Sequence, residues 1–264
     1  MIDEQVQNAF TPDATVPRRN IKLVIAYNGA AYHGWQRQVE GLDTVQLQIE
    51  QTVCRVVRHP VNVMAASRTD AGVHAAGQVA NFYSNNFAIP LAGMRSAVNS
   101  RLPHDIAVLS AVEVADDFHA SRSAVGKTYR YRIFVAPQRP VELNGQVYHY
   151  WRPLEIEPMR QAAARLLGTH DFRGFTSSME VRENSVRTIR RCEVAEAGSE
   201  IHITVQGDGF LYNMVRNIVG TLLEVGRGHW PPDRIDLVLQ SLNRADAGPT
   251  APPDGLTLMC VHYE

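Results

Sequence analysis

The sequence is poor in lysine and in cysteine. Of the 26 Lys+Arg residues in the 264-residue chain, only Lys22 and Lys127 are lysines, so almost all of the positive charge is arginine. Arginine suits phosphate recognition and stacking, although a codon preference explains the same count. The three cysteines, Cys54, Cys192 and Cys260, are far apart and form no Cys-x-x-Cys pair. This spacing excludes a disulfide framework and a zinc ribbon.

Metal-ligand spacings, long apolar runs and a signal peptide are also missing. The 10 histidines do not occur in a His-Glu-x-x-His or His-x-His pattern. No apolar run is long enough to span a membrane, and the opening MIDEQVQNAF has acids where a signal peptide needs basic and then apolar residues. We therefore expect a cytoplasmic protein with no metal and no membrane partner.

Neither sign of charge dominates the chain, but the charge is unevenly distributed. The formal net charge of −1 excludes a wholly basic nucleic-acid coat protein. Residues 1–120 carry a net charge of −2, residues 121–191 of +7 and residues 192–264 of −6. A basic middle segment is typical of a surface that binds a polyanion, and equally of a solvated face. Charge alone leaves both interpretations open.

The remaining composition is that of a folded protein, because 45% of the residues are hydrophobic. Residues 1–20 are polar with two prolines and predict a loose tail. In the first half we expect strands at 21–27, 61–67, 78–84 and 106–115, and helices at 44–57 and 91–102. Asp43 is the predicted N-cap of the first helix, with Gln46 placed as in a capping box. This β-α-β-β-α-β order is that of the split ferredoxin-like unit.

The second half has a similar order. We expect strands at 128–136, 186–197, 200–207 and 256–263, and helices at 158–168, 212–226 and near 233–242. The strands at 186–197 and 200–207 should form a hairpin around Gly198. The helix at 158–168 should bury one apolar stripe, composed of Met159, Ala162, Ala163, Leu166 and Leu167.

These patterns predict an α+β fold of two ferredoxin-like or RRM-like β-α-β-β-α-β halves. Each half would have a sheet backed by helices, with a cleft between the halves. The expected domains are a flexible N-terminal tail at 1–20, an N-terminal ferredoxin-like domain at 21–120, and a C-terminal α+β domain at 121–264.

The densest candidate for chemistry is the segment ASRTDAGVHAAGQVANF at 66–82. Asp70 follows a predicted strand, two residues after Arg68, and a nearby positive charge helps to keep a carboxylate ionised. Such a carboxylate can act as a nucleophile or as a base. A loop aspartate that caps a turn is the plainer interpretation. A glycosidase-type pair is not favoured, because the next acid, Asp105, follows an intervening helix.

Two further segments combine charge with aromatic or apolar residues. In the strand at 128–136, Tyr129 and Tyr131 alternate with Arg130 and Arg132, a composition that binds unstacked bases but also fits aromatics inside and cations outside. Arg216 interrupts an apolar helix. The Arg216 guanidinium either reaches the surface while the aliphatic part of the side chain is buried, or pairs with a buried acid. The spacing does not decide between these two interpretations.

Seven segments, spread along the chain, carry recognisable sequence motifs. They are AYNGAAYHGWQRQ (26–38), SRTDAGVHAAGQV (67–79), DDFHASRSAVGKTYRYRI (116–133), GTHDFRGF (168–175), VRTIRR (186–191), GFLYNMVRNIVGTLLEVGRG (209–228) and APPDGLTLMCVHY (251–263). Together they resemble the tRNA pseudouridine synthase A (TruA) family from about residue 22 to residue 263. The combination is very specific.

The resemblance implies a two-domain α+β fold and a homodimer. It also implies isomerisation of uridine to pseudouridine in the anticodon stem-loop of tRNA, at positions 38, 39 and 40, without cofactor or metal. Asp70 would be the catalytic aspartate and Arg68 its neighbour in the loop. Tyr129 would pack on the target base, and Arg216 would pair with the aspartate.

The implied reaction fits these residues. It breaks the N1–C1′ glycosidic bond, rotates the uracil and rejoins it through C5, so no atoms enter or leave and no cofactor is needed. The carboxylate would attack C6 or C1′, or initiate elimination at C2′, and the sequence leaves all three open. A target base inside a stem must be flipped out and held, which suits a stacking tyrosine. We also hypothesise that Arg187, Arg190 and Arg191 contact the tRNA backbone.

The chain departs from the family pattern at three places. Ser67 stands where the family usually has glycine, Ser121-Arg122 shifts an arginine by one position, and Asn28 replaces the commoner aspartate.

Two other functions compete with the enzyme. A tRNA-binding paralogue without activity is one alternative, and a ferredoxin-like metabolic domain with an exposed acidic loop is another. Retention of Asp70 together with Tyr129 and Arg216 favours the enzyme.

Overall fold

The computed structural model describes residues 16–38, 41–177 and 184–264, and the chain is divided into two compact units. The first unit contains the chain up to Ala124 together with Tyr263 and Glu264, and the second contains Val125–His262. Of the predicted tail at 1–20, residues 1–15 lie outside the described residues. The first strand already begins at Arg19.

The first unit has the element order that the sequence predicts for this half. Its elements are β1 (Arg19–Tyr27), α2 (Val45–Val57), β2 (Met64–Ala65), β3 (His74–Ser84), α3 (Leu91–Asn99) and β4 (Ile106–Val114). The strands are antiparallel in the order β4-β1-β3-β2. The predicted strand at 61–67 is wrong in extent, because only two of its residues pair with β3. β3 begins four residues earlier than expected, at His74.

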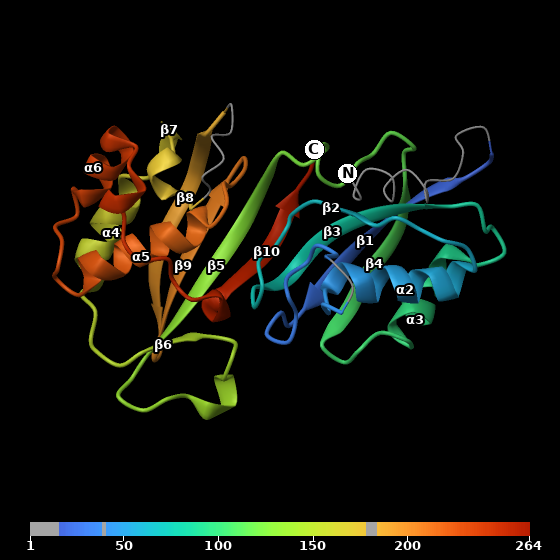
Figure 1. Cartoon of the computed structure of the whole chain (residues 1–264), viewed down its shortest axis with the longest axis horizontal. Coiled ribbons are helices and arrows are strands. Elements are labelled where there is room, and N and C mark those ends of the chain that lie inside the picture. Colours follow the sequence, from blue (N-terminus) through green and yellow to red (C-terminus); the bar gives the residue numbers. More distant parts are fainter. Residues whose placement is uncertain (1–15, 39–40, 178–183) are drawn as a thin grey trace. The chain divides into compact units, whose positions relative to one another are not determined.

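The core of this unit lies between the sheet and its two helices. Along β1, Ile21, Leu23 and Ile25 are fully buried and alternate with half-buried residues, as expected for a strand with one covered face. On the helix side, Ile49 and Val53 of α2 are fully buried. Figure 1 shows α2 and α3 beside each other, covering one face of the strands.

The predicted N-cap of α2 is wrong by one residue. Thr44 has extended backbone angles, and its Oγ1 accepts a hydrogen bond from the Leu47 N–H at 3.4 Å. Asp43 instead accepts from the Gln48 amide at 2.7 Å. Gln46 forms no capping box, because its side-chain oxygen accepts from the Arg37 N–H at 2.9 Å, while its amide nitrogen donates to Glu50 and to the Val63 carbonyl. The helix begins at Val45, so residue 44 and not residue 43 occupies the N-cap position.

The second unit has more elements. They are β5 (Gly126–Val135), η1 (Val141–Leu143), β6 (Tyr148–Tyr150), α4 (Ile156–Ala164), β7 (Gly168–Asp171), η2 (Arg173–Phe175), β8 (Val186–Ala197), β9 (Glu200–Gly207), α5 (Met214–Gly226), α6 (Arg234–Ser241), η3 (Arg244–Asp246), η4 (Pro253–Gly255) and β10 (Leu256–His262). The strand order is β10-β5-β9-β8-β7, all antiparallel, with β6 parallel to β5. The predicted hairpin of β8 and β9 is confirmed, with Gly198 at φ +63° in its turn.

Short strands β6 and β7 and helix α6 are additions to the order found in the first unit. The remaining long elements follow the sequence β5-α4-β8-β9-α5-β10. One predicted core residue in this unit is wrong, because Leu167 is 44% exposed while Met159 and Leu166 are fully buried. α4 ends at Ala164, so helical periodicity no longer sets the direction of residue 167.

Tyr263 belongs to the first unit although it follows the whole of the second. Its hydroxyl donates to the Ala120 carbonyl at 2.7 Å, and its ring lies 5.2 Å from that of Phe118. The Lys22 ammonium lies 5.5 Å from each of these rings. Burial raises the pKa of the Tyr263 hydroxyl.

Gly220 allows helix α5 to pack closely against the backbone at Pro249. A Cβ at Gly220 would lie 1.7 Å from the Pro249 carbonyl oxygen, whereas a Cβ at Gly93 in α3 would meet nothing within 4 Å. We expect Gly220→Ala to lower the free energy of unfolding by about 3 kcal/mol or more. Gly93→Ala should raise it by about 0.5–1 kcal/mol. Urea unfolding of the two variants checks this, and equal effects would contradict the close contact.

Candidate active site

The loop between β2 and β3 carries the predicted catalytic residue. Asp70 opens a β-turn in which the Val73 N–H donates to the Asp70 carbonyl at 3.1 Å, and Gly72 takes the left-handed position at φ +79°. Thr69 is buried, Asp70 is half-buried and Arg68 is exposed. The loop therefore turns the side chain of Thr69 inward and that of Arg68 outward.

Segment 27–35 holds the backbone of this loop. The Thr69 carbonyl accepts from the Trp35 N–H at 3.0 Å, and the Thr69 hydroxyl lies 2.8 Å from the Tyr27 hydroxyl. The Gly72 N–H donates to the Tyr32 carbonyl at 3.3 Å. The conformation of residues 69–72 is thus fixed by contacts from a second, distant segment.

Two glycines make this approach possible. A Cβ at Gly34, which has φ +91°, would lie 2.7 Å from the Thr69 carbonyl oxygen. A Cβ at Gly29 would lie 2.0 Å from the Val73 carbonyl oxygen. The Gly29 N–H also donates to Nδ1 of buried His74 at 3.0 Å. The two glycines of the opening motif therefore leave room for residues 69–73 of the loop.

Tyr32 and Asp105 form a contact that sequence reasoning missed. The Tyr32 hydroxyl donates to the Asp105 carboxylate at 2.7 Å, and burial together with this carboxylate raises the pKa of Tyr32. The Asp105 carbonyl accepts from the Asn28 N–H at 2.9 Å. The Asn28 side-chain oxygen accepts from the Ala30 N–H at 3.1 Å. An aspartate oxygen would accept the same bond, so the departure at residue 28 keeps this geometry.

Ser67 fits the loop without strain. Its N–H donates to the Gln78 side-chain oxygen at 3.2 Å, and the Gln78 amide donates to the Ser67 carbonyl at 2.7 Å. The Ser67 backbone is outside the left-handed region that favours glycine. The backbone angles at residue 67 therefore do not require glycine.

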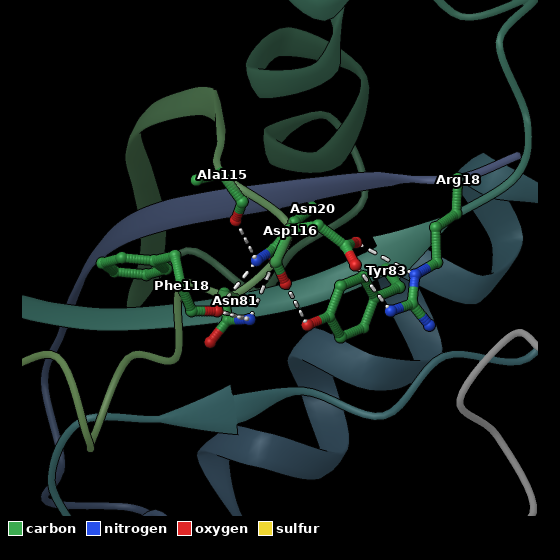
Figure 2. Close-up of polar contacts among 7 residues, drawn as sticks. All are labelled: Arg18, Asn20, Asn81, Tyr83, Ala115, Asp116 and Phe118. Carbon is green, nitrogen blue, oxygen red and sulfur yellow. Dashed lines mark hydrogen bonds and ion pairs between the residues drawn. The ribbon is translucent and has the colours of Figure 1, made fainter. Parts of the chain in front are cut away.

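Two buried asparagines of the first unit hold the segment at 115–120 (Figure 2). The Asn20 amide donates to the carbonyls of Ala115 and Phe118 at 3.0 and 2.8 Å. The Asn81 amide donates to the Asn20 oxygen at 2.9 Å, and the Asn81 oxygen accepts from the Ala120 N–H at 2.8 Å. Because buried amides need partners, this pair fixes the backbone of the DDFHA motif.

Arg18 secures the start of the same motif. Its guanidinium binds the Asp116 carboxylate through two hydrogen bonds of 3.0 and 2.8 Å, which lower the pKa of Asp116. Arg18 also lies 4.2 Å over the Tyr83 ring, and the Tyr83 hydroxyl donates to the Asp116 carbonyl, as Figure 2 shows. Arg122, the displaced arginine, is exposed, and its N–H donates to Nδ1 of His119 at 3.4 Å.

Tyr129 lies in the second unit, on the covered face of β5. It is 6% exposed and packs edge-on against Phe210, with ring centroids 5.2 Å apart. The predicted alternation is confirmed, since Tyr131 is buried while Arg130 and Arg132 are half-buried on the other face. Arg132 binds the Glu200 carboxylate through two hydrogen bonds of 2.7 and 2.6 Å.

Arg216 lies in the first turn of α5. Its Nε donates to the Ala251 carbonyl at 2.7 Å, and one terminal nitrogen donates to the Asn213 side chain at 3.0 Å. Asn213 is the N-cap of α5 in the left-handed conformation, at φ +57°. The guanidinium therefore holds the main chain near residue 251, a role that neither sequence interpretation included.

The neighbouring Asn217 is fully buried and joins three segments. Its amide donates to the Phe175 carbonyl at 2.7 Å. Its oxygen accepts from Arg244 at 3.0 Å and from the Thr250 hydroxyl at 2.7 Å. This asparagine fixes the loops around the start of α5.

The three clustered arginines of β8 have different surroundings. Arg191 is ion-paired with Glu193 at 2.5 Å, and Arg190 donates to the Val125 carbonyl at 3.3 Å. Arg187 donates to the carbonyls of Asn184 and Val186. A register shift between residues 189 and 191 separates their directions.

The site residues predicted from the sequence therefore fall into two groups. Arg68 and Asp70 share one loop of the first unit, while Tyr129 on β5 and Arg216 on α5 belong to the second. Within the described ranges, no group of three His, Cys, Asp or Glu side chains is placed to hold a metal ion. No helix in this part of the chain is long and apolar enough to cross a membrane.

Comparison with known proteins agrees with this arrangement of motifs. A family model described as tRNA pseudouridine synthase matches residues 23–121 and 162–264. The chain belongs to this family of tRNA-modifying isomerases. The match includes the loop with Arg68 and Asp70, and α5 with Arg216.

Curated relatives match nearly the whole chain. "tRNA pseudouridine synthase A 2" of Clostridium perfringens is 45% identical over 93% of this chain and 100% of its own length. "tRNA pseudouridine synthase A" of Acetivibrio thermocellus shows the same identity and coverage. Among solved structures, the archaeal box H/ACA sRNP Nop10-Cbf5 complex aligns at 11% identity and a TM-score of 0.35, over 86% of this chain and 46% of that chain.

The contact between Gly34 and Thr69 is testable by substitution. We expect Gly34→Ala to reduce pseudouridine formation by at least about tenfold, because its Cβ displaces the Thr69 carbonyl and with it the Asp70 turn. Gly41→Ala is the matched control, since Gly41 has a similar φ of +94° but its Cβ position has no atom of the described residues within 4 Å. Single-turnover rates on tRNA compare the two, and equal losses would show that backbone strain, not the contact, matters.

Proposed function

We propose that the chain isomerises uridine to pseudouridine in the anticodon stem-loop of tRNAs, at positions 38, 39 and 40. Asp70 is the catalytic residue, and the reaction uses no cofactor. Tyr129, Arg68 and Arg216 bind the substrate. The observation that carries this proposal is the Asp70 turn, which the segment at 27–35 holds through main-chain contacts.

A fixed turn supports a catalytic role for Asp70. Its backbone is bound at Thr69, Gly72 and Val73, so little conformational freedom is lost when the carboxylate meets a substrate. The carboxylate then attacks C6 or C1′ of the nucleotide, or initiates elimination at C2′. In each case the same atoms are present before and after the reaction, so no external reagent is consumed.

The other residues supply binding. The Tyr129 ring offers an aromatic surface to a flipped base, and its packing against Phe210 keeps the ring in one orientation. Exposed Arg68 is available to a backbone phosphate. Arg216 is oriented by Ala251 and Asn213, and its positive charge favours the ionised form of a carboxylate that pairs with it.

The proposal includes a homodimer in the cytoplasm, where tRNA is the partner. It also includes a common ferredoxin-like topology for both units, which their similar order of long elements supports. The cleft between the halves stays a prediction. A tRNA-binding protein without activity is the competing outcome of the experiments below.

The role of Asp70 is tested by Asp70→Asn. Asparagine also favours the first position of this turn, so the variant should fold and bind tRNA. We expect release of tritium from tRNA with 5-tritiated uridine to fall by at least about a thousandfold, because the nucleophile or base is lost. Tritium release by the variant at the wild-type rate would refute the assignment. No release by either the wild type or the variant would favour a protein that binds tRNA without activity.

The role of Tyr129 is tested by two substitutions. Tyr129→Phe keeps the aromatic face and should reduce the single-turnover rate much less than Tyr129→Ala, which removes the ring and its packing. Thermal unfolding of both variants shows whether they remain folded. Similar losses of rate in two folded variants would argue against stacking on the base.

The positions of modification are tested by mapping. Unmodified tRNA transcripts treated with wild-type protein should contain pseudouridine at 38, 39 or 40, wherever uridine occurs there. Carbodiimide labelling followed by reverse transcription locates the products. Modification confined to other stems would refute the proposed site in the RNA while leaving the activity intact.

A further inference from the structure

Lys127 lies on the same face of β5 as Tyr129, two residues away. The pairing of β5 with β9 is continuous from Lys127 to Phe134, so the alternation of side chains is unbroken between these positions. Two residues of a strand span about 7 Å. A group bound at Lys127 would therefore lie close to a base that contacts Tyr129.

The Lys127 ammonium is half-buried and lacks a counterion. Across the described chain, no hydrogen bond or ion pair joins it to another side chain. Three other half-buried cations of the protein each bind a carboxylate: Arg37 binds Glu50, Arg132 binds Glu200 and Arg234 binds Asp246. Arg19 and Arg244 bind no carboxylate but donate to carbonyl oxygens. Among the described residues Lys127 has neither kind of partner, although burial of a charge normally requires one.

A second cation, Arg187, lies on the same face of the sheet. Lys127 pairs with Gly207 of β9, and Gly207 pairs with Ile189 of β8, two residues from Arg187. Burial and the positive charge of Arg187 lower the pKa of the Lys127 amine. Arg187 is itself half-buried, and a Cβ at Gly209 would lie 3.3 Å from its Nε. Glycine at 209 therefore leaves room for the guanidinium beside β8.

Two like charges in partly desolvated positions destabilise a fold unless an anion joins them. We propose that Lys127 and Arg187 bind one backbone phosphate of the RNA substrate, adjacent to the base that Tyr129 contacts. This inference rests on the proposed function. It separates Arg187 from Arg191, whose charge is already balanced by Glu193.

The near-absence of lysine makes a direct test possible. Lys127 and Lys22 are the only lysines, and Lys22 lies against two aromatic rings of the first unit. We expect saturating unmodified tRNA to slow acetylation of Lys127 by an N-hydroxysuccinimide ester at least about tenfold, while Lys22 reacts at an unchanged rate. Peptide mass spectrometry measures both sites in one sample. Equal reactivity of Lys127 with and without bound tRNA would overturn the proposal.

A pair of matched variants tests the same site through affinity. Lys127→Met should weaken tRNA binding about tenfold and reduce the slope of log K against log salt by about 0.7–0.9, the value for one phosphate contact. Lys22→Met should change neither. The melting temperature of Lys127→Met should stay the same or rise, because an unpaired charge is removed. An unchanged salt slope with a lower melting temperature would show a structural lysine instead.

These measurements separate the two proposals. Binding and acetylation need no turnover, so a protein that binds tRNA without forming pseudouridine would refute the proposed function and leave the phosphate site testable. An active enzyme whose Lys127 is neither protected nor needed for the salt dependence would refute the phosphate site alone.

Discussion

The first unit depends on a contact between two stretches of main chain. Gly29 and Gly34 approach the carbonyl groups of Val73 and Thr69 so closely that no side chain fits between them. Because the closest contacts are made by backbone atoms, the main chain of residues 29–35 sets the path of residues 69–73. Rigid support from one segment and chemistry from another is a common division in enzymes.

Much of the fold could be predicted, because alternation and helical spacing record which face of an element is buried. The hairpin of β8 and β9 and the inward tyrosines of β5 follow directly from that record. The predictions were wrong at positions where the local hydrophobic pattern does not determine the structure. The extent of β2 is set by its partner β3, and the direction of Leu167 by the end of α4. Neither limit is encoded in hydrophobic spacing.

The sequence motifs identified the candidate site residues, but not the contacts that hold the surrounding segments in place. The resemblance singled out Asp70, Tyr129 and Arg216, whose roles remain proposals. It could not reveal the Tyr32–Asp105 bond or the Asn20–Asn81 pair, because these partners lie 73 and 61 residues apart. Contacts at such separations depend on the packed fold. The three arginines of β8 look alike in sequence, yet only the structure shows that a carboxylate neutralises Arg191.

Tyr263 gives the first unit an unusual dependence on the order of synthesis. Its ring and hydroxyl complete the cluster around Phe118 and Ala120, but the ribosome makes it only after all of Val125–His262. A nascent first unit must therefore expose the apolar surface beside Phe118 while the second unit is being translated. Folding of the first unit is thus not purely vectorial, because its last aromatic contact forms only after the second unit has been made.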